Sequence, residues 1–454
     1  MSAGRNAEMK KNDLLTLTAN NLDVDQAGVC SHDGVVVFVP GLLPGETAPV
    51  KILKVEKRYA FGRLEEAPLS PSSTRRASDC PSFPRCGGCT GRHMTYESTL
   101  EAKRRQVEDC FQRIGGISVS VPMPLGMAHP FAYRNKTSLP VGGTQETPFL
   151  GFFAPRSHAV IPVTQCPNAM PPSDQIASSF LDWVREHRLE PYQEKTRKGL
   201  LRHLVIRTNR HGESMVTVVG NAASLPCSSA LIQALLPLKV VSLYYNVNRN
   251  MTNVILSDSF HLLYGRKTLQ DELCGLSFEL SPASFFQINP LQTEKLYAEA
   301  LSMADLKGTE TVCDVYCGVG TITLMLAKHC HQVLGIEVVP AAVENARKNA
   351  VLNKIDNVNF LCGAAEKILP RLVENEMKPD VIVVDPPRKG LDPAVIQAIS
   401  HASPSRLVYI SCNAATLARD AGQFSQLGYT VRQVQPVDMF AWTSGIETAV
   451  LMTR

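Results

Sequence analysis

The sequence predicts a multidomain protein with a small N-terminal β-barrel, an α+β central domain and a C-terminal α/β domain built on a parallel sheet. Its 454 residues are too many for one ordinary domain. Short strand-like runs punctuated by glycine and proline fill residues 14–64, as in small barrels. Strand-like and helix-like runs alternate from residue 311 onward, which indicates βαβ units. We place the three domains at residues 8–68, 75–270 and 275–454.

The composition of the chain indicates which classes of protein it can belong to. The net charge is only +4, so a polyanionic partner has to be argued from where the basic residues lie. The thirteen cysteines are an odd number spread over a long chain, which does not resemble a secreted disulfide scaffold. No apolar signal core and no run of about 18 apolar residues occurs. We therefore expect a cytoplasmic protein that does not span a membrane and whose cysteines are mostly thiols.

The predicted barrel carries cations next to aromatic residues. Tyr59 and Phe61 lie in a basic stretch, and such a mixture suits phosphate contact combined with base stacking. The stretch contains Lys51, Lys54, Lys57, Arg58 and Arg63. A solvated basic face is the alternative interpretation. The pattern therefore favours a nucleic-acid surface on the barrel without establishing it.

A linker rich in proline, serine and arginine, residues 68–79, precedes a cluster of cysteines. Cys80, Cys86 and Cys89 fall within ten residues, with two glycines before the last, and Cys166 comes much later, next to a proline. Zinc usually takes its thiolates as two close pairs, whereas a three-plus-one set followed by proline is closer to iron–sulfur usage. The spacing therefore favours a 4Fe-4S cluster over zinc.

Basic residues also recur in the predicted central domain, several of them in short strand-like runs where alternate residues share one face. They are Arg92, His93, Lys103 to Arg105, Arg134, Lys136, Arg156, Arg202 and Arg207. Together they could form a basic sheet surface for RNA. Taken singly, each is more readily explained as a solvated or salt-bridged residue than as a phosphate ligand.

The C-terminal domain places polar residues at the ends of its predicted strands. Gly318 and Gly320 follow the first strand, Glu337 ends the second, and Asp385 with two prolines ends the fourth. A third glycine, which a pyrophosphate would need, is missing from the first turn. A glycine turn with an acidic strand end but no phosphate features points to a nucleoside cofactor such as S-adenosylmethionine.

The fifth predicted strand, residues 406–411, ends at a thiol, Cys412, and a helix-forming segment comes next. Open α/β sheets bind their ligands at this end of the strands. Sulfur is a strong nucleophile, and a helix N-terminus can lower a thiol pKa from about 8.5. Cys412 is therefore a candidate nucleophile, with a small core cysteine as the alternative.

With these motifs assembled, the chain resembles the RNA uracil-5-methyltransferase family, in the branch that combines a TRAM barrel, an iron–sulfur cluster and a Rossmann-like class I methyltransferase domain. The matching stretches are GLLPGE, FFQIN, DVYCGVGTITL, VDPPRKG, YISCNAATLARD and GIET. By this resemblance Cys412 is the nucleophile and Glu447 the base. The residues that would bind the cofactor or line its site are Gln287, Tyr316, Glu337 and Asp385. The residues that would hold a 4Fe-4S cluster are Cys80, Cys86, Cys89 and Cys166.

The resemblance implies methylation of carbon 5 of a uridine by S-adenosylmethionine, through a covalent bond between Cys412 and carbon 6. It favours 23S ribosomal RNA as the substrate, with transfer RNA as the alternative, and a monomeric enzyme. One departure is that Ala441 and Trp442 stand where the family more often has a Pro-His pair.

Two further alternatives stay open. Asp385-Pro-Pro also resembles motifs of amino-group methyltransferases, which would not need Cys412, although Arg388 stands where these enzymes usually have an aromatic residue. A protein of a different class, an RNA-binding or iron–sulfur redox protein that retains the fold, would not need Cys412 and Glu447 together.

Overall fold

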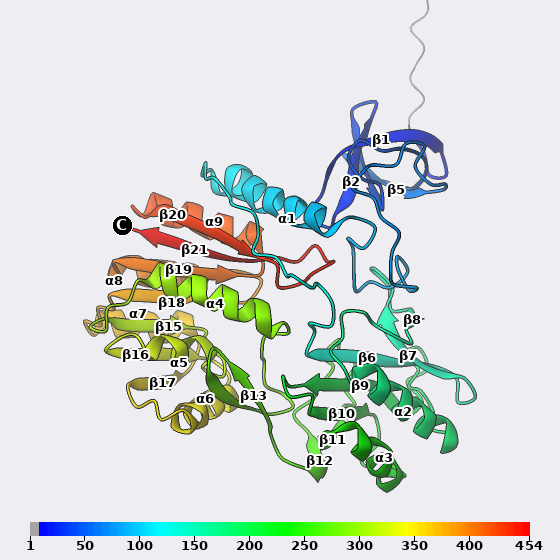
Figure 1. Cartoon of the computed structure of the whole chain (residues 1–454). Coiled ribbons are helices and arrows are strands. Elements are labelled where there is room, and N and C mark those ends of the chain that lie inside the picture. The colour runs from blue at the N-terminus through cyan, green and yellow to red at the C-terminus, as the bar shows by residue number, and fades with distance from the viewer. Residues whose placement is uncertain (1–8) are drawn as a thin grey trace, which may run out of the picture.

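Five short strands close into a barrel at the N-terminal end of the chain (Figure 1). The computed structural model describes residues 9–454, so residue 8, the first of the predicted barrel domain, lies outside the described residues. Alternate side chains point inward, and Leu17, Val37 and Val50 are buried in the barrel core. The strands are β1 (Leu14–Leu22), β2 (Ala27–His32), β3 (Val35–Pro40), β4 (Thr47–Val55) and β5 (Tyr59–Leu64), in the order β1-β2-β3-β5-β4. The predicted barrel is confirmed.

Glu46 fastens the linker that connects the barrel to the rest of the chain. Its carboxylate is fully buried and accepts hydrogen bonds from the backbone N–H groups of Leu43 (2.8 Å) and Ser72 (3.0 Å) and from Nε of Arg75 (2.6 Å). Burial acts to raise the pKa of Glu46, but the hydrogen bonds from Arg75 and the backbone outweigh it and hold the pKa below its usual range. The linker is therefore an ordered connection.

A seven-stranded, mostly antiparallel sheet is formed by the middle part of the chain. Two helices, α2 (Ser173–Glu186) and α3 (Ser228–Leu235), cover one face, where Phe180 and Leu231 are buried against Leu204 of the sheet. The strands are β6 (Lys136–Gly143), β7 (Pro148–Phe153), β8 (Val160–Pro162), β9 (Leu201–Thr208), β10 (Ser214–Gly220), β11 (Val240–Val247) and β12 (Phe260–Gly265), in the order β12-β11-β10-β9-β6-β7-β8. A separate hairpin, β13 (Leu269–Leu273) and β14 (Leu276–Leu280), leads to the C-terminal domain.

The C-terminal sheet also has seven strands, and its five predicted parallel strands are all present. They are β15 (Thr311–Val315), β16 (Gln332–Glu337), β17 (Val358–Cys362), β18 (Val381–Val384) and β19 (Arg406–Ser411). Two further strands, β20 (Thr430–Val437) and β21 (Glu447–Thr453), complete the order β17-β16-β15-β18-β19-β21-β20. The last strand, β21, therefore lies antiparallel between β19 and β20.

Helices cover both faces of this sheet (Figure 1). One core contains apolar residues of α4 (Pro290–Ala304), α5 (Thr321–Ala327) and α6 (Pro340–Leu352). The other contains apolar residues of α7 (Ala365–Glu374), α8 (Pro393–Ala402) and α9 (Ala414–Gln426). The doubly wound α/β fold predicted from the alternating pattern is thus present. None of the helices in residues 9–454 has the length and apolar character needed to cross a membrane.

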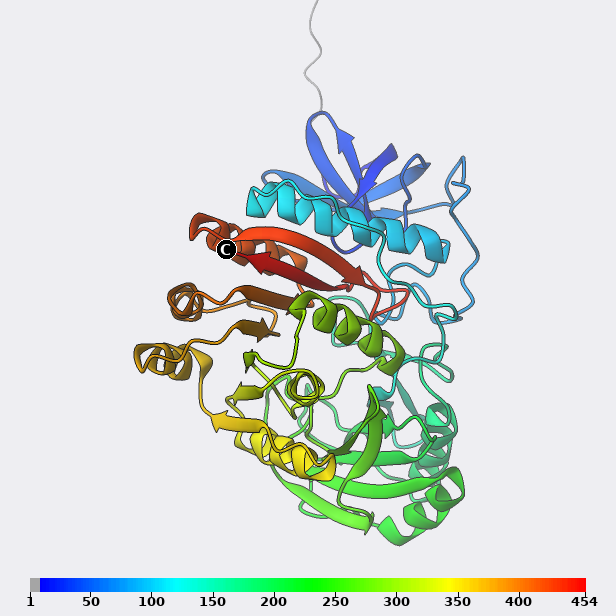
Figure 2. The same cartoon turned by 60° about the vertical axis from the view of Figure 1, so that its left-hand side comes forward.

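Helix α1 (Tyr96–Cys110) lies between the barrel and the β20–β21 edge of the C-terminal sheet (Figure 2). Val107 and Phe111 are buried in the same core as Tyr409 of β19. The turn after the helix approaches α9 so closely that a Cβ atom on Gly115 would lie 2.7 Å from the carbonyl oxygen of Ala418. Although α1 falls within residues 75–270, its packing joins it to the C-terminal sheet.

A buried ion pair fixes α1 to that edge. Nζ of Lys103 lies 2.5 Å from Oδ1 of Asp438, the residue after β20, and both side chains are fully buried. The hydroxyl of Tyr96 donates to Oδ2 of Asp438 at 2.6 Å. Burial lowers the pKa of Lys103 although Asp438 acts to raise it. The pair therefore specifies where the helix docks more than it adds stability.

Replacing Lys103 with methionine is expected to destabilise the protein by about 3–5 kcal/mol, because it leaves the Asp438 carboxylate buried without its cation. Chemical denaturation followed by far-UV circular dichroism measures the loss. The matched variant Lys103→Met with Asp438→Asn removes both charges and should recover most of it. A double variant as unstable as the single one would show that the lost packing of the lysine stem, not the unpaired charge, is responsible.

Candidate active site

The carboxyl ends of the parallel strands carry three of the four predicted cofactor residues, Tyr316, Glu337 and Asp385. After β15, Tyr316 and Gly318 have positive φ angles of 74° and 56°, and the turn brings the N–H of Gly318 to 3.1 Å from Oε2 of Glu337 at the end of β16. The other oxygen of Glu337, Oε1, accepts from the N–H of Val339 at 2.8 Å. The Glu337 carboxylate is therefore held in one orientation beside the turn.

Asp314 lies in β15 and Asp385 directly after the adjacent strand β18, and the charge of Asp314 affects the protonation of Asp385. Burial raises the pKa of Asp314 to about 7, while a hydrogen bond from Thr323 opposes the shift. Burial also raises the pKa of Asp385, to about 7, and the charge of Asp314 adds to it. Oδ1 of Asp314 is buried and has no hydrogen-bond partner among the described residues. The site therefore holds an acceptor that is free for a ligand, and carries less negative charge at neutral pH than two ordinary aspartates would.

Cys412 comes directly after β19, as predicted, and is partly exposed. The next residue, Asn413, caps α9: its Oδ1 accepts from the N–H groups of Ala415 (3.1 Å) and Thr416 (3.4 Å). Because the cap uses these two N–H groups, neither of them is directed at the thiol.

The pKa of Cys412 shifts in the direction opposite to the one expected for a thiol at a helix N-terminus. Burial raises the pKa of the Cys412 thiol, and the charge of Glu447 raises it further, while Arg388 acts to lower it. The expectation failed because burial and the neighbouring acid depend on contacts between strands that are distant in sequence. The resting thiol is thus protonated, and a substrate or a neighbouring group has to promote its ionisation.

Glu447 reaches Cys412 because β21 is inserted next to β19. The register pairs Thr448 with Ser411, so the base and nucleophile predicted from the resemblance begin and end adjacent strands. Burial raises the pKa of Glu447 well above its usual range, the charge of Asp385 raises it further, and Arg388 opposes the shift. Oε2 of Glu447 is buried and has no hydrogen-bond partner within residues 9–454.

Arg388 is a site residue that the sequence analysis missed. Its positive charge acts on both Cys412 and Glu447, and its carbonyl oxygen accepts hydrogen bonds from Nδ2 of Asn413 (3.1 Å) and from Oγ1 of Thr416 (3.2 Å) at the start of α9. The signal was present, because a cation three residues after Asp385 must lie near the same strand ends. In the sequence it stands out only as a departure from the amino-methyltransferase pattern.

Gln287 belongs to the segment that connects the middle of the molecule to α4. Nδ2 of Asn135, just before β6, donates to the carbonyl oxygen of Gln287 at 2.9 Å. Asn289 caps α4 and donates from Nδ2 to the carbonyl oxygen of Met439 at 3.1 Å. The segment therefore lies between the central sheet and the connection from β20 to β21.

The four predicted cysteine ligands, Cys80, Cys86, Cys89 and Cys166, line one small cavity. Sγ of Cys86 accepts from the N–H of Gly88 at 3.3 Å, and Sγ of Cys89 accepts from Nδ2 of Asn168 at 3.4 Å. Arg92 and Arg134 line the same cavity. In the described part of the chain, however, no three histidine, cysteine or acidic side chains converge closely enough to hold a metal ion.

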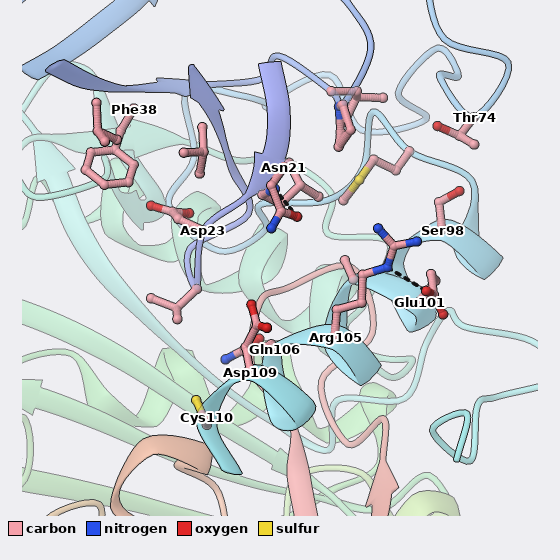
Figure 3. A pocket seen from close by; sticks show the side chains of 18 of the residues that line it. Asn21, Asp23, Phe38, Thr74, Ser98, Glu101, Arg105, Gln106, Asp109 and Cys110 are labelled. Carbon is pink, nitrogen blue, oxygen red and sulfur yellow. Dashed lines mark hydrogen bonds and ion pairs between the residues drawn. The ribbon is translucent and has the colours of Figure 1, made fainter. Parts of the chain in front are cut away.

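A separate cavity of about 690 Å³ lies between the barrel and α1 (Figure 3). Asn21, Asp23 and Phe38 contribute from the barrel, and Glu101 and Arg105 from the helix, where they form an ion pair of 2.6 Å. The predicted site residues, all of which the structure describes, lie elsewhere. The volume of a cavity therefore does not by itself identify the candidate active site.

Not all of the basic residues of the central region are available for the sheet surface that the sequence allowed for RNA. Several are buried in internal contacts: Arg92 pairs with Asp79, Lys103 with Asp438, and the Arg207 guanidinium donates to the carbonyl oxygen of Ser284 at 2.5 Å. The salt-bridged alternative holds for Arg92 and Lys103, and Arg207 is held by a backbone carbonyl; in each case a group distant in sequence supplies the partner.

The barrel retains an exposed aromatic group. Tyr59, with 40% of its surface exposed, lies 5.9 Å from Phe38 and 5.5 Å from Phe61 between ring centres. The guanidinium of Arg156, from the central sheet region, lies 5.3 Å from the centre of the Phe61 ring. This group gives bases a surface for stacking beside a cation.

The chain is similar to known RNA methyltransferases over most of its length. Residues 260–454 match the family described as tRNA (Uracil-5-)-methyltransferase, and residues 20–64 match the TRAM domain. The chain is 42% identical to an RNA methyltransferase of Clostridium tetani, over 98% of this chain and 97% of that protein. It is also 42% identical to an RNA methyltransferase of Halalkalibacterium halodurans, over 98% of each.

A solved structure has a similar fold over almost the whole chain. It is the tRNA (uracil-54, C5)-methyltransferase of Pyrococcus abyssi in complex with S-adenosyl-L-homocysteine. The TM-score is 0.76 at 25% sequence identity, and the match covers 97% of this chain and 100% of that one.

Proposed function

The chain belongs to the tRNA (uracil-5-)-methyltransferase family, and we propose that it methylates carbon 5 of a uridine in 23S ribosomal RNA through a covalent bond between Cys412 and carbon 6. The observation that carries the proposal is the insertion of β21 beside β19, which sets Glu447 next to the strand that ends at Cys412. A nucleophile and a proton acceptor from different strands thus meet at the sheet edge where ligands of α/β folds bind.

The residue types suit the reaction. Carbon 5 of uracil is a weak nucleophile, so the Cys412 thiolate adds first to carbon 6 and the electron pair of the double bond moves toward carbon 5 and the carbonyl oxygen. Arg388 stabilises the thiolate, because its positive charge opposes the raised pKa of Cys412. After methylation, Glu447 removes the proton from carbon 5, the double bond forms again and the bond from carbon 6 to sulfur breaks.

S-adenosylmethionine, when bound, supplies a methyl group on a positively charged sulfur. The fit of this group to the chain rests on three features: the turn at Gly318, the oriented carboxylate of Glu337 and the free buried Oδ1 of Asp314. Glu337 is placed to accept hydrogen bonds from ribose hydroxyls. Gln287, Tyr316 and Asp385 would line the rest of the site.

The four cysteines would hold a 4Fe-4S cluster. Their shared cavity, the N–H and amide donors to Cys86 and Cys89, and the buried Nε atoms of Arg92 and Arg134, which have no partner within residues 9–454, all suit a negatively charged metal–sulfur group. Each thiolate of such a cluster binds a different iron, so the sulfurs need not converge on one ion. We assign the cluster a structural role, apart from the methyl transfer.

The target base has to leave its helical stack to reach Cys412, so the substrate is expected to present the uridine in a loop or bulge. The aromatic group of Phe38, Tyr59 and Phe61 would hold neighbouring RNA. Transfer RNA is the second candidate, favoured by the family match and by the full-length similarity to the Pyrococcus abyssi enzyme. The cysteine set favours ribosomal RNA.

The test uses ribosomal and transfer RNA containing 5-fluorouracil, with labelled S-adenosylmethionine. Fluorine on carbon 5 cannot leave as a proton, so the covalent product is trapped and is expected as a labelled protein–RNA band on a denaturing gel. A band with transfer RNA alone would correct the substrate class. Methyl transfer to ordinary RNA without any trapped band would instead support an amino-group methyltransferase.

A further inference from the structure

Trp442 lies in a loop of the C-terminal domain that also contacts the barrel and the central region. It belongs to residues 438–446, which connect β20 to β21 and are called the base loop here because they end immediately before Glu447. Its indole is 1% exposed, and it is one of only two tryptophans in the sequence. A residue of this size buried in a loop contributes packing that a smaller side chain cannot replace.

The segment from Cys80 to Arg92, which carries three of the four predicted cysteine ligands and is called the cysteine region here, holds the backbone and the ring of Trp442. The N–H groups of Thr90 and Gly91, directly after Cys89, both donate to the carbonyl oxygen of Trp442 at 3.0 Å. The guanidinium of Arg92 lies 5.4 Å from the centre of the indole, and that of Arg76 lies 5.0 Å from it. Arg92 also donates to Asn168, whose amide reaches Sγ of Cys89. The cysteine cavity and the base loop are thus joined through successive direct contacts.

Further contacts of the base loop come from the barrel and from residues before the central sheet. The indole Nε1 donates to the carbonyl oxygen of Pro130 at 2.7 Å, and the Tyr133 hydroxyl donates to that of Ala441 at 2.9 Å. Gln26 of the barrel donates to the carbonyl oxygen of Thr443 at 3.4 Å. Together with the Lys103–Asp438 pair at its start, the loop is fixed at several points outside the C-terminal domain, in addition to the contacts of Met439 and Asp438 with the start of α4.

We infer that Trp442 is a positioning residue, through which the cysteine region orients the base loop and so holds Glu447 for proton removal. This inference rests on the proposed function and adds that the two halves of the reaction depend on different parts of the structure. Cys412 is carried by β19 and α9, which receive none of these contacts, so the first half of the reaction does not depend on Trp442. The second half does, because the loop leads directly into Glu447.

The step at issue is the resolution of the covalent product. The Glu447 carboxylate takes the proton from carbon 5, the electron pair of that bond forms the double bond between carbon 5 and carbon 6, and the sulfur of Cys412 leaves with the electrons of the carbon–sulfur bond. A displacement of about 1 Å in a catalytic group can cost on the order of 100-fold in rate. Release should therefore slow while methyl transfer to carbon 5 proceeds.

The test compares Trp442→Ala with wild type on ordinary uridine RNA, under single-turnover conditions, with labelled S-adenosylmethionine. We expect methyl incorporation at nearly the wild-type rate, but at least about a tenfold larger fraction of methylated RNA bound to protein on a denaturing gel. Trp442→Phe keeps the ring and should return most of that fraction to the wild-type level. Tyr133→Phe, which removes one hydrogen bond to the loop, should shift it in the same direction by less.

Trp183→Ala is the matched control, because Trp183 is the other buried tryptophan and packs in α2, away from the base loop. Its loss should lower stability without enlarging the bound fraction. Equal bound fractions in the two alanine variants, or a parallel loss of both steps in the Trp442 variants, would overturn the inference. If wild type forms no covalent product even with 5-fluorouracil RNA, the proposed function itself has failed, which is a distinct outcome.

The link to the cysteine region has its own measurement. In a Trp183→Phe background, Trp442 is the only indole, so its fluorescence reports on the base loop. Cys89→Ser in the purified holoprotein is expected to shift the emission to longer wavelength and to enlarge the bound fraction, as Trp442→Ala does. Unchanged emission and an unchanged fraction would show that the loop is oriented without the cysteine region.

Discussion

Replacing Cys412 with alanine is expected to lower single-turnover methyl incorporation by about 10⁶-fold, the scale on which removal of a covalent nucleophile acts. The trapped band with 5-fluorouracil RNA should vanish as well. The physical reason is that carbon 5 stays unreactive unless a thiolate adds to carbon 6. Labelled S-adenosylmethionine and filter-bound RNA measure the first effect, and a denaturing gel measures the second.

The control for this experiment is Cys227→Ala, which removes an exposed thiol at the start of α3. It should leave incorporation and trapping at wild-type levels. Persistent methylation in Cys412→Ala would contradict the covalent mechanism. The motif Asp385-Pro-Pro would then be interpreted as a site for an exocyclic amine.

Replacing Glu447 with glutamine is expected to lower multiple-turnover methylation by about 10²–10⁴-fold, the usual contribution of a general base. Because the amide cannot take the carbon 5 proton, methylated RNA should stay attached to Cys412 and accumulate even without fluorine. The bound fraction on a denaturing gel, against total incorporation, measures this. Free methylated product released at the wild-type rate would exclude Glu447 as the base.

The raised pKa of Glu447 adds a pH dependence. A carboxyl whose pKa is raised by burial stays protonated until the pH exceeds that value, so release of product in the wild type should accelerate as the pH rises. The glutamine variant should lose this dependence. Its folding stability should also exceed that of wild type at high pH, because the native state no longer has to bury a charge there. Thermal melts at about pH 6 and about pH 9 compare the two proteins.

Most of the C-terminal fold was predictable because its signals are local. A buried parallel strand is a run of apolar residues, and the residues that come next in the sequence must lie at its carboxyl end. Asp385 and Cys412 could therefore be assigned to one sheet edge before their distance was known. The barrel was predictable for a similar reason, since Leu17, Val37 and Val50 occupy alternating inward positions.

The contacts that could not be predicted depend on partners distant in sequence. The local sequence predicts that Lys103 is a surface lysine on a charged helix. In the structure it is buried, because Asp438 pairs with it. The position of Cys412 before a helix predicts a lowered thiol pKa. Its pKa is raised instead, because burial and the charge of Glu447 outweigh Arg388. In the sequence, Trp442 is only a departure from the family pattern. Its contacts with the cysteine region join residues far apart in the chain and are given by the structure alone. Periodicity carries no information about such pairs.

The position of α1 limits how the protein can be dissected. Val107 and Phe111 complete the core that contains Tyr409, so residues 260–454 alone, although they match the methyltransferase family, would leave that apolar face open to water. Such a fragment should aggregate or require detergent when expressed alone. A minimal catalytic unit would instead be discontinuous, made of the segment around α1 and the C-terminal half, and supplying that segment as a separate peptide should restore its solubility.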